Sequence, residues 1–137
     1  MADIRTNGKN ETDTFALAAL AANIAESKKA SETVLLETGQ VSYLADYFVI
    51  CSGESSTQIR TIADDIEKRF KQRGLTPIGK ERDAASKWAL LDYGDVVIHI
   101  MNRQEREYYQ LEHFWSHANV VSQEEWLVDE YKQQLAS

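Results

Sequence analysis

The sequence predicts a single-domain α/β protein in which a mixed sheet of about five strands is flanked by helices. Short runs rich in β-branched and aromatic residues alternate with stretches whose apolar residues recur at helical spacing, a pattern typical of layered α/β folds. The 137 residues suit one hydrophobic core. Their content of 43% hydrophobic and 27% charged residues is that of an ordinary globular domain.

The first predicted helix begins at Thr14 and ends near Lys29. Asp13 or Thr14 can cap its start, and Lys28 and Lys29 suit its carboxyl end. Its apolar residues at helical spacing are Leu17, Leu20, Ala21 and Ile24. Residues 1–12 are polar and lack this periodicity, so we expect a flexible arm there.

Two strands and a second helix follow. Residues 33–38 and 47–51 are β-rich runs, which predicts two strands. Ser55 with Gln58 matches a capping box at the start of the next helix, and Gly74 is suited to end it. The apolar stripe of this helix consists of Ile59, Ile62, Ala63, Ile66 and Phe70.

The second half of the chain predicts three more strands, at residues 75–81, 88–92 and 95–101. The only proline, Pro77, places the first of them near a sheet edge, because proline cannot donate to a strand ladder.

Two helices are then expected to close the chain. Residues 104–117 carry Tyr108, Leu111 and Trp115 on one helical face, and Ser122 with Glu125 offers a capping box for a helix that reaches Leu135. We therefore expect the domain to span residues 13–118, with residues 119–137 as a C-terminal helical extension.

The strands at 88–92 and 95–101 predict a hairpin with two different faces. With Tyr93 and Gly94 as a two-residue loop, Trp88 lies opposite His99. One face is then aliphatic and belongs under the helices; it holds Ala89, Leu91, Val96, Ile98 and Ile100. The other holds Trp88, Leu90, Val97, His99 and Met101, with Asp92 and Asp95 at its rim. The residue types of this second face suit a partner surface, and burial under further helices is an equally open interpretation.

The net charge of −7 disfavours direct nucleic-acid binding and is compatible with steering towards a basic partner. No apolar run approaches the roughly 20 residues of a membrane span, and the first residues do not resemble a signal peptide, so we expect no membrane contact. Cys51 is the only cysteine, which excludes an internal disulfide and weakly favours the cytoplasm. Its apolar strand predicts a buried thiol.

Three patterns are candidate sites of chemistry. The turn of residues 52–56 leads from a strand into a helix, as in a nucleotidyltransferase entrance, but it lacks the phosphate-binding patterns and carries Glu54, which favours simple capping. His113 and His117 have the spacing of two metal ligands without a third. His99 with Asp95 or Asp92 lacks a nucleophile. The sequence thus predicts no catalytic residue, no metal and no cofactor.

Several separated motifs nevertheless occur in one order. They are Asp46-Tyr47-Phe48-Val49-Ile50-Cys51-Ser52-Gly53 with Ser55-Ser56 and Ile62-Ala63, Gly74-Leu75 with Pro77, Trp88 four before Asp92, Gly94-Asp95-Val96-Val97-Ile98-His99, and Arg106-Glu107-Tyr108-Tyr109 with Leu111-Glu112 and Trp115. With this ordered set the chain closely resembles the Iojap-like family, also called ribosomal silencing factor S (RsfS), over roughly residues 14–117.

The resemblance implies a nucleotidyltransferase-like fold without transferase activity. It implies binding to ribosomal protein fourteen of the large subunit at the subunit interface, which sterically blocks joining of the small subunit and represses translation under nutrient limitation. Relatives in organelles act in large-subunit assembly, and some relatives form homodimers when free. An assembly factor and a nucleotidyltransferase-type enzyme are the alternatives. The resemblance assigns the partner contact to Trp88 and, less firmly, to Leu90, Asp92, His99, Met101, Arg106 and Tyr109.

Overall fold

The computed structural model of the chain describes residues 2–39, 45–82 and 85–128. Its helices are α1 (Ala2–Ser27), α2 (Ser56–Gln72), α3 (Arg103–Tyr109), α4 (Leu111–Phe114) and α5 (Gln123–Trp126). Its strands are β1 (Ser31–Glu37), β2 (Tyr47–Ser52), β3 (Gly79–Arg82), β4 (Trp88–Asp92), β5 (Val96–Met101) and β6 (Asn119–Val121).

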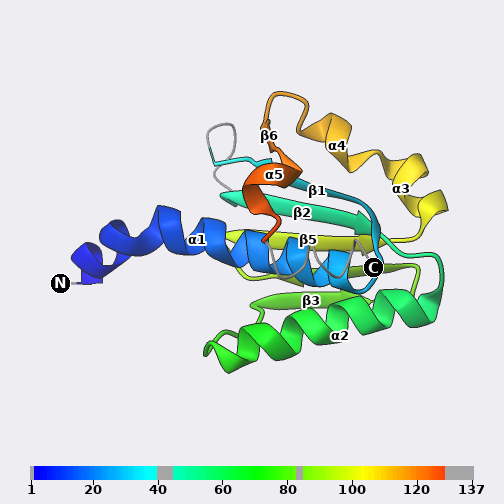
Figure 1. Ribbon diagram of the computed structural model, residues 1–137, viewed down its shortest axis with the longest axis horizontal. Coiled ribbons are helices and arrows are strands. Elements are labelled where there is room, and N and C mark those ends of the chain that lie inside the picture. The colour runs from blue at the N-terminus through cyan, green and yellow to red at the C-terminus, as the bar shows by residue number, and fades with distance from the viewer. Residues whose placement is uncertain (1, 40–44, 83–84, 129–137) are drawn as a thin grey trace.

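The strands form one mixed sheet in the order β3-β4-β5-β2-β1-β6 (Figure 1). The β2–β5 pair is parallel, and the other neighbours are antiparallel. The mixed α/β sheet is therefore confirmed, with six strands in the described residues where about five were predicted. The additional strand is β6, in a segment assigned to a helical extension. Three residues are too few to show a periodicity, so only the pairing with β1 reveals this strand.

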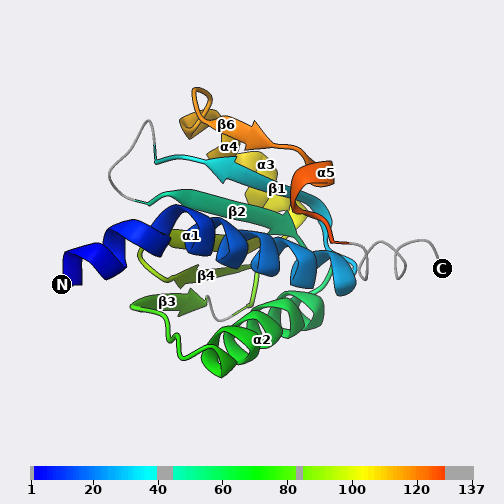
Figure 2. The same ribbon diagram turned by 60° about the vertical axis from the view of Figure 1, so that its left-hand side comes forward.

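Helices α1 and α2 cover one face of the sheet, and α3 and α4 lie on the other (Figures 1 and 2). The predicted stripe of α2 is confirmed, because all five of its apolar residues are buried. They pack on the aliphatic side chains of β2, β4 and β5 and on α1. In the described part of the chain no helix is both long and apolar enough to cross a membrane.

Helix α1 begins at Ala2, so the predicted start at Thr14 was wrong. Figure 1 shows the first turns of α1 projecting past the sheet. Residues there need no apolar stripe, which explains why the sequence pattern missed them. The proposed division into an arm, a domain of residues 13–118 and an extension stays a prediction.

The caps of α2 agree with the sequence. Ser55 Oγ accepts a hydrogen bond from Gln58 N at 3.0 Å, and Gln58 Oε1 accepts one from Glu54 N at 2.6 Å. In a capping box the second bond would return to the backbone N–H of the cap, Ser55. Here it goes to Glu54, the residue before the cap. Gly74 follows the helix with φ of 83°, a left-handed conformation that glycine adopts without strain.

The β4–β5 hairpin forms with a different loop from the predicted one. Tyr93 N donates to Val96 O, so Gly94 and Asp95 make the turn, and Trp88 lies opposite Met101 instead of His99. The predicted register was wrong by two residues. Because side chains alternate with a period of two, this shift leaves the two predicted faces unchanged.

The predicted helix 104–117 is two helices, α3 and α4. They are separated at Gln110, whose backbone is left-handed with φ of 48° and ψ of 54°. The capping box of Ser122 and Glu125 is present, but α5 ends at Trp126 and Leu127 is extended. The remainder of the predicted last helix, beyond residue 128, lies outside the described residues.

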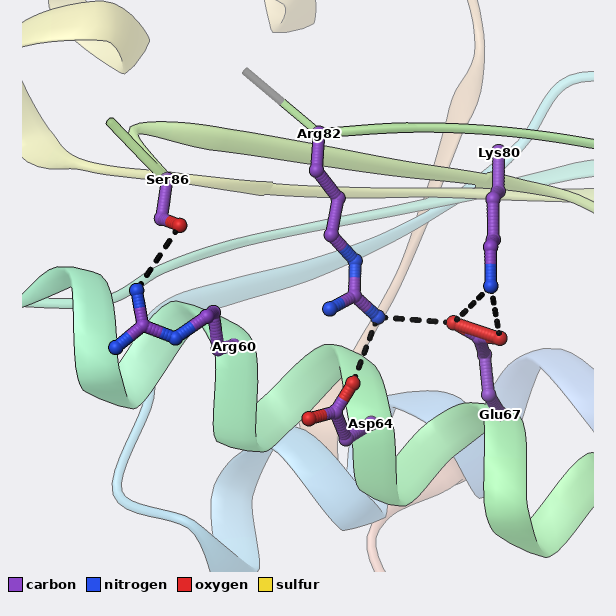
Figure 3. A network of polar contacts seen from close by, with 6 residues as sticks. All are labelled: Arg60, Asp64, Glu67, Lys80, Arg82 and Ser86. Atoms are coloured by element: carbon purple, nitrogen blue, oxygen red, sulfur yellow. Dashed lines mark hydrogen bonds and ion pairs between the residues drawn. The ribbon is translucent and has the colours of Figure 1, made fainter. Parts of the chain in front are cut away.

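Strand β3 is shorter than predicted and lies at the sheet edge, as expected from Pro77. Ion pairs with α2 hold it (Figure 3): Arg82 Nη2 contacts Asp64 at 2.8 Å and Glu67 at 2.9 Å, and Lys80 Nζ contacts Glu67 at 3.1 Å. Lys80 and Arg82 thus point to the α2 side. By alternation, Glu81 points to the opposite face of the sheet.

Candidate partner-binding face

Six aromatic rings form a continuous row across the sheet face opposite α1 and α2. Neighbouring ring centroids along this aromatic row lie 4.9, 4.8, 5.7, 5.7 and 4.8 Å apart. In order, the row consists of Tyr108, Tyr109, Trp88, His99, Phe48 and Trp115. The strands β2, β4 and β5 supply its middle, and α3 and the end of α4 supply its ends. The predicted Trp88 face therefore exists, and it is larger than the hairpin alone suggested.

A hydrogen bond fixes the centre of the row. Trp88 Nε1 donates to His99 Nδ1 at 3.0 Å. Burial lowers the pKa of His99 to about 4, against the opposing effect of the Asp92 carboxylate. At neutral pH the imidazole is therefore uncharged, with its proton on Nε2, because Nδ1 is the acceptor.

Helices cover this face only in part, so burial under further helices, one of the two interpretations left open, holds for one region of it. Leu111 and Trp115 pack with Phe48, Ile50 and Met101 into a second, smaller core. Met101 is fully buried, so it supports the face from below. In contrast, Trp88, Leu90, Val97 and His99 are only half-buried.

A pocket of about 390 Å³ lies beside this half-buried region, lined by Glu81, Arg82, Trp88 and Leu90. Glu81 lies opposite Leu90 across the strands and shares its face. Asp92 is half-buried and its Oδ1 accepts a hydrogen bond from Gly94 N, and Asp95 in the turn is exposed. Acidic groups therefore line the rim of an apolar surface.

The structure gives different positions to the three side chains considered on α3. Tyr109 is 45% exposed and packs on Trp88. Arg106 is only 7% exposed and binds Glu112 and Ser52 inside the protein. Tyr108, which the sequence placed on one helical face with Leu111 and Trp115, is 80% exposed. The helical phase assumed through residue 117 fails because the helix breaks at Gln110.

The turn of residues 52–56 is the place where a nucleotidyltransferase site was considered. It lines a pocket of about 390 Å³ together with Ser31, Asn102, Arg103 and Gln104. A Cβ on Gly53 would lie 2.8 Å from Ile59 Cγ1, so packing against α2 accounts for this glycine. Ser55 caps α2, which is the simpler of the two functions weighed for this turn.

The other candidate groups differ in their exposure. Cys51 is buried, as predicted, and burial raises the pKa of its thiol to about 12. His113 and His117 are both exposed. Among the described residues, no three His, Cys, Asp or Glu side chains are grouped so that they could hold a metal ion.

Comparison with known families identifies the chain. A family model described as "Ribosomal silencing factor during starvation" matches residues 11–137. The chain belongs to this ribosomal silencing factor family. The resemblance found in the sequence motifs is therefore confirmed.

Individual relatives match most of this chain. The ribosomal silencing factor RsfS of Halalkalibacterium halodurans is 38% identical over 105 residues, which cover 77% of this chain and 90% of the relative. The RsfS protein of Bacillus subtilis is 36% identical over 99 residues, which cover 72% of this chain and 84% of that relative. The chloroplastic Iojap protein of Zea mays is 26% identical over 119 residues, covering 87% and 52%.

Two crystal structures also match this silencing factor. One, of a protein from Chromobacterium violaceum, has a TM-score of 0.70 at 29% identity and covers 73% of this chain and 83% of that one. Another, from Bacillus halodurans, has a TM-score of 0.65 at 36% identity and covers 75% and 93%. The mixed α/β fold predicted from the sequence is therefore that of its relatives.

Proposed function

We propose that this protein binds ribosomal protein fourteen of the large ribosomal subunit through the half-buried part of the aromatic row, and that it thereby prevents the small subunit from joining. The aromatic row carries the proposal. Membership of the silencing factor family supports the ribosome as the target, and the row is the surface best suited to a protein contact.

Two physical properties support this surface. Trp and Tyr side chains supply large contact areas at low entropic cost, and a central buried aromatic can contribute about 2 kcal/mol or more to binding. Trp88 is already held by His99 and Tyr109, so little conformational freedom is lost on binding. We propose Trp88, Leu90 and Tyr109 as direct contacts and His99 as their support.

Charge favours a basic partner. The protein carries a net charge of −7, and Glu81, Asp92 and Asp95 lie around Leu90 and the β4–β5 turn. Such a rim accelerates encounter with a basic surface and disfavours contact with bare RNA. We assign the inhibitory effect to steric exclusion without catalysis, since a protein bound at the subunit interface occupies space that the small subunit needs.

The test is a sucrose gradient of separated subunits, brought to conditions of reassociation with and without the protein. The unaltered protein should migrate with large subunits and leave small subunits free. Trp88→Ala and Leu90→Asp should lose both effects while keeping the circular dichroism spectrum. Val128→Asp, at a side chain that is 45% exposed beyond α5, is the matched control and should act like the unaltered protein.

Full activity of both face variants would refute the assigned surface. Binding to large subunits without any effect on joining would refute steric exclusion and favour an assembly function. Incubation with ATP and Mg²⁺ tests the enzyme alternative, which nucleotide turnover would support.

A homodimer of the free protein is part of the same proposal. An exposed aromatic surface that serves the ribosome can also bury itself against a second copy. Sedimentation velocity should then show a dimer that Leu90→Asp dissociates, and large subunits should compete with the dimer for the same face.

A further inference from the structure

The side chain of Arg106 joins three elements next to the aromatic row. Its Nε and Nη2 donate to Glu112 Oε2 at 3.0 and 2.7 Å, and its Nη1 donates to Ser52 Oγ at 3.0 Å. Ser52 is the last residue of β2, and Glu112 belongs to α4. One guanidinium therefore ties α3 both to the sheet and to the next helix.

Helix α3 needs tertiary contacts because it is short. It has 7 residues, too few to be stable on local hydrogen bonds alone. It ends at Gln110, in a left-handed conformation that side-chain-bearing residues disfavour, and α4 begins without a side-chain cap. The angle between α3 and α4 thus depends on tertiary contacts, and the Arg106–Glu112 ion pair spans the break.

The direction of α3 sets the exposed end of the aromatic row. Tyr109 follows Arg106 by three residues and packs on Trp88, with ring centroids 4.8 Å apart. Tyr108 packs edge-on against Tyr109 and extends into solvent. Any rotation or shift of α3 would move both tyrosines relative to Trp88.

We propose that Arg106 and Glu112 are positioning residues: they hold α3 so that Tyr109 packs on Trp88 and Tyr108 prolongs the row into solvent. The importance of this positioning for a partner rests on the proposed function. The arrangement of these side chains is independent of the proposed function. For Arg106, the positioning function replaces the direct partner contact that the family resemblance assigned to it.

The geometry requires arginine and a carboxylate. The planar guanidinium presents two donors to one carboxylate oxygen and a third to Ser52, which a lysine ammonium on a flexible stem does not reproduce. Glu112→Gln keeps an acceptor oxygen of the same size and removes the charge. Arg106→Lys and Glu112→Gln are therefore the test variants. Arg103→Lys and Glu107→Gln, at exposed positions of the same helix, are their matched controls.

The first measurement needs no ribosome. In a ¹⁵N correlation spectrum, the indole N–H signal of Trp88 is assigned by its loss in Trp88→Phe. Both test variants should shift this signal, and both controls should leave it in place. If it stays unmoved in both test variants, the proposal is wrong. If both test variants unfold, the pair serves global stability, and the proposal is equally wrong.

The second measurement separates positioning from contact. Arg106→Lys should weaken binding to purified large subunits about tenfold in the natural protein but by less than about twofold in a Tyr109→Ala background, because the pathway through Tyr109 is already lost. Equal losses in both backgrounds would mean that Arg106 contacts the partner itself, which overturns the proposal. If the unaltered protein does not bind large subunits, the proposed function fails, and the Trp88 signal alone decides the positioning.

Discussion

Trp88 and His99 are diagonal neighbours on β4 and β5, and the indole of Trp88 donates to the Nδ1 atom of His99 at 3.0 Å. Protonation of His99 would place a second N–H group against this donor and remove the acceptor. The bond therefore requires a neutral imidazole. Its presence at the centre of the aromatic row links the geometry of the proposed partner face to the protonation state of one histidine.

This bond predicts an acid-sensitive stability. Burial lowers the pKa of His99 from 6.5 to about 4 in the folded protein, so between these values the unfolded chain binds a proton that the folded protein does not. The free energy of unfolding should therefore fall as pH falls through this window, by at most about 3 kcal/mol. Urea titrations at about pH 7 and about pH 4.5 measure the change.

His99→Gln is the matched control, because glutamine offers an acceptor oxygen without titrating. Carboxylates titrate in the same window in both proteins. The quantity compared is therefore, for each protein, the difference in the free energy of unfolding between the two pH values. The variant should lose less stability on acidification than the natural protein. Equal losses would show that His99 is not the responsible group.

The hairpin shows why much of the site was predictable. The loop was misplaced, yet the two faces were right, because a shift of two residues preserves the alternation of side chains. Strong local patterns, such as the apolar stripe and Ser55 cap of α2, were likewise sufficient to define that helix. These features depend on short-range chemistry that the sequence carries directly.

Features that depend on tertiary contacts could not be read in this way. Nothing local marks Gln110 as a helix break, because its left-handed backbone is held by contacts such as the Arg106–Glu112 pair. The same break separates the exposed Tyr108 from Leu111 and Trp115, with which it was expected to share one helical face. The burial of Arg106 could not be read locally for a related reason: its two partners, Ser52 and Glu112, come from separate elements.

The glycine that precedes α2 provides a stability prediction. A Cβ on Gly53 would approach Ile59 Cγ1 to 2.8 Å, and Ile59 is buried at the start of the α2 stripe. Gly53→Ala should therefore destabilise the protein by about 1–3 kcal/mol through overpacking. Thermal unfolding followed by circular dichroism measures the loss.

Gly79→Ala is the control for this change. A Cβ there would meet Asp92 Cβ at 3.8 Å, an ordinary contact, and alanine costs less backbone entropy than glycine in a strand. This variant should be neutral or slightly stabilising. A Gly53→Ala protein as stable as Gly79→Ala would mean that Ile59 moves aside freely.

The buried side chain of Asn23 is expected to contribute more to stability than a surface side chain of similar size. It is 2% exposed, its Nδ2 donates to Ala19 O and Trp126 O at 2.7 Å each, and its Oδ1 accepts from Val128 N at 3.0 Å. Asn23→Leu would leave the groups near α5 without these partners, at a cost of about 2–3 kcal/mol. Urea unfolding followed by tryptophan fluorescence measures it.

Ser27→Ala is the comparison on the same helix. Ser27 Oγ donates only to Ile24 O, one turn back, so its loss should cost less than about 1 kcal/mol. Similar losses for the two variants would contradict a specific function of Asn23 in holding α5 against α1.

Tyr108 separates binding from stability. Its ring is 80% exposed and packs on Tyr109, so Tyr108→Ala should change the free energy of unfolding by less than about 0.5 kcal/mol. Because Tyr108 lies at the outer end of the proposed partner face, removing its ring should weaken binding to large subunits roughly tenfold.

Ile78→Ala is the control. It removes a side chain that is 76% exposed and lies outside the aromatic row, so it should change neither the free energy of unfolding nor the affinity for large subunits. If Tyr108→Ala binds with undiminished affinity, the partner face is limited to Trp88, Leu90 and Tyr109. If Ile78→Ala weakens binding as much as Tyr108→Ala, the contact lies closer to the β3 edge, because Ile78 immediately precedes that strand.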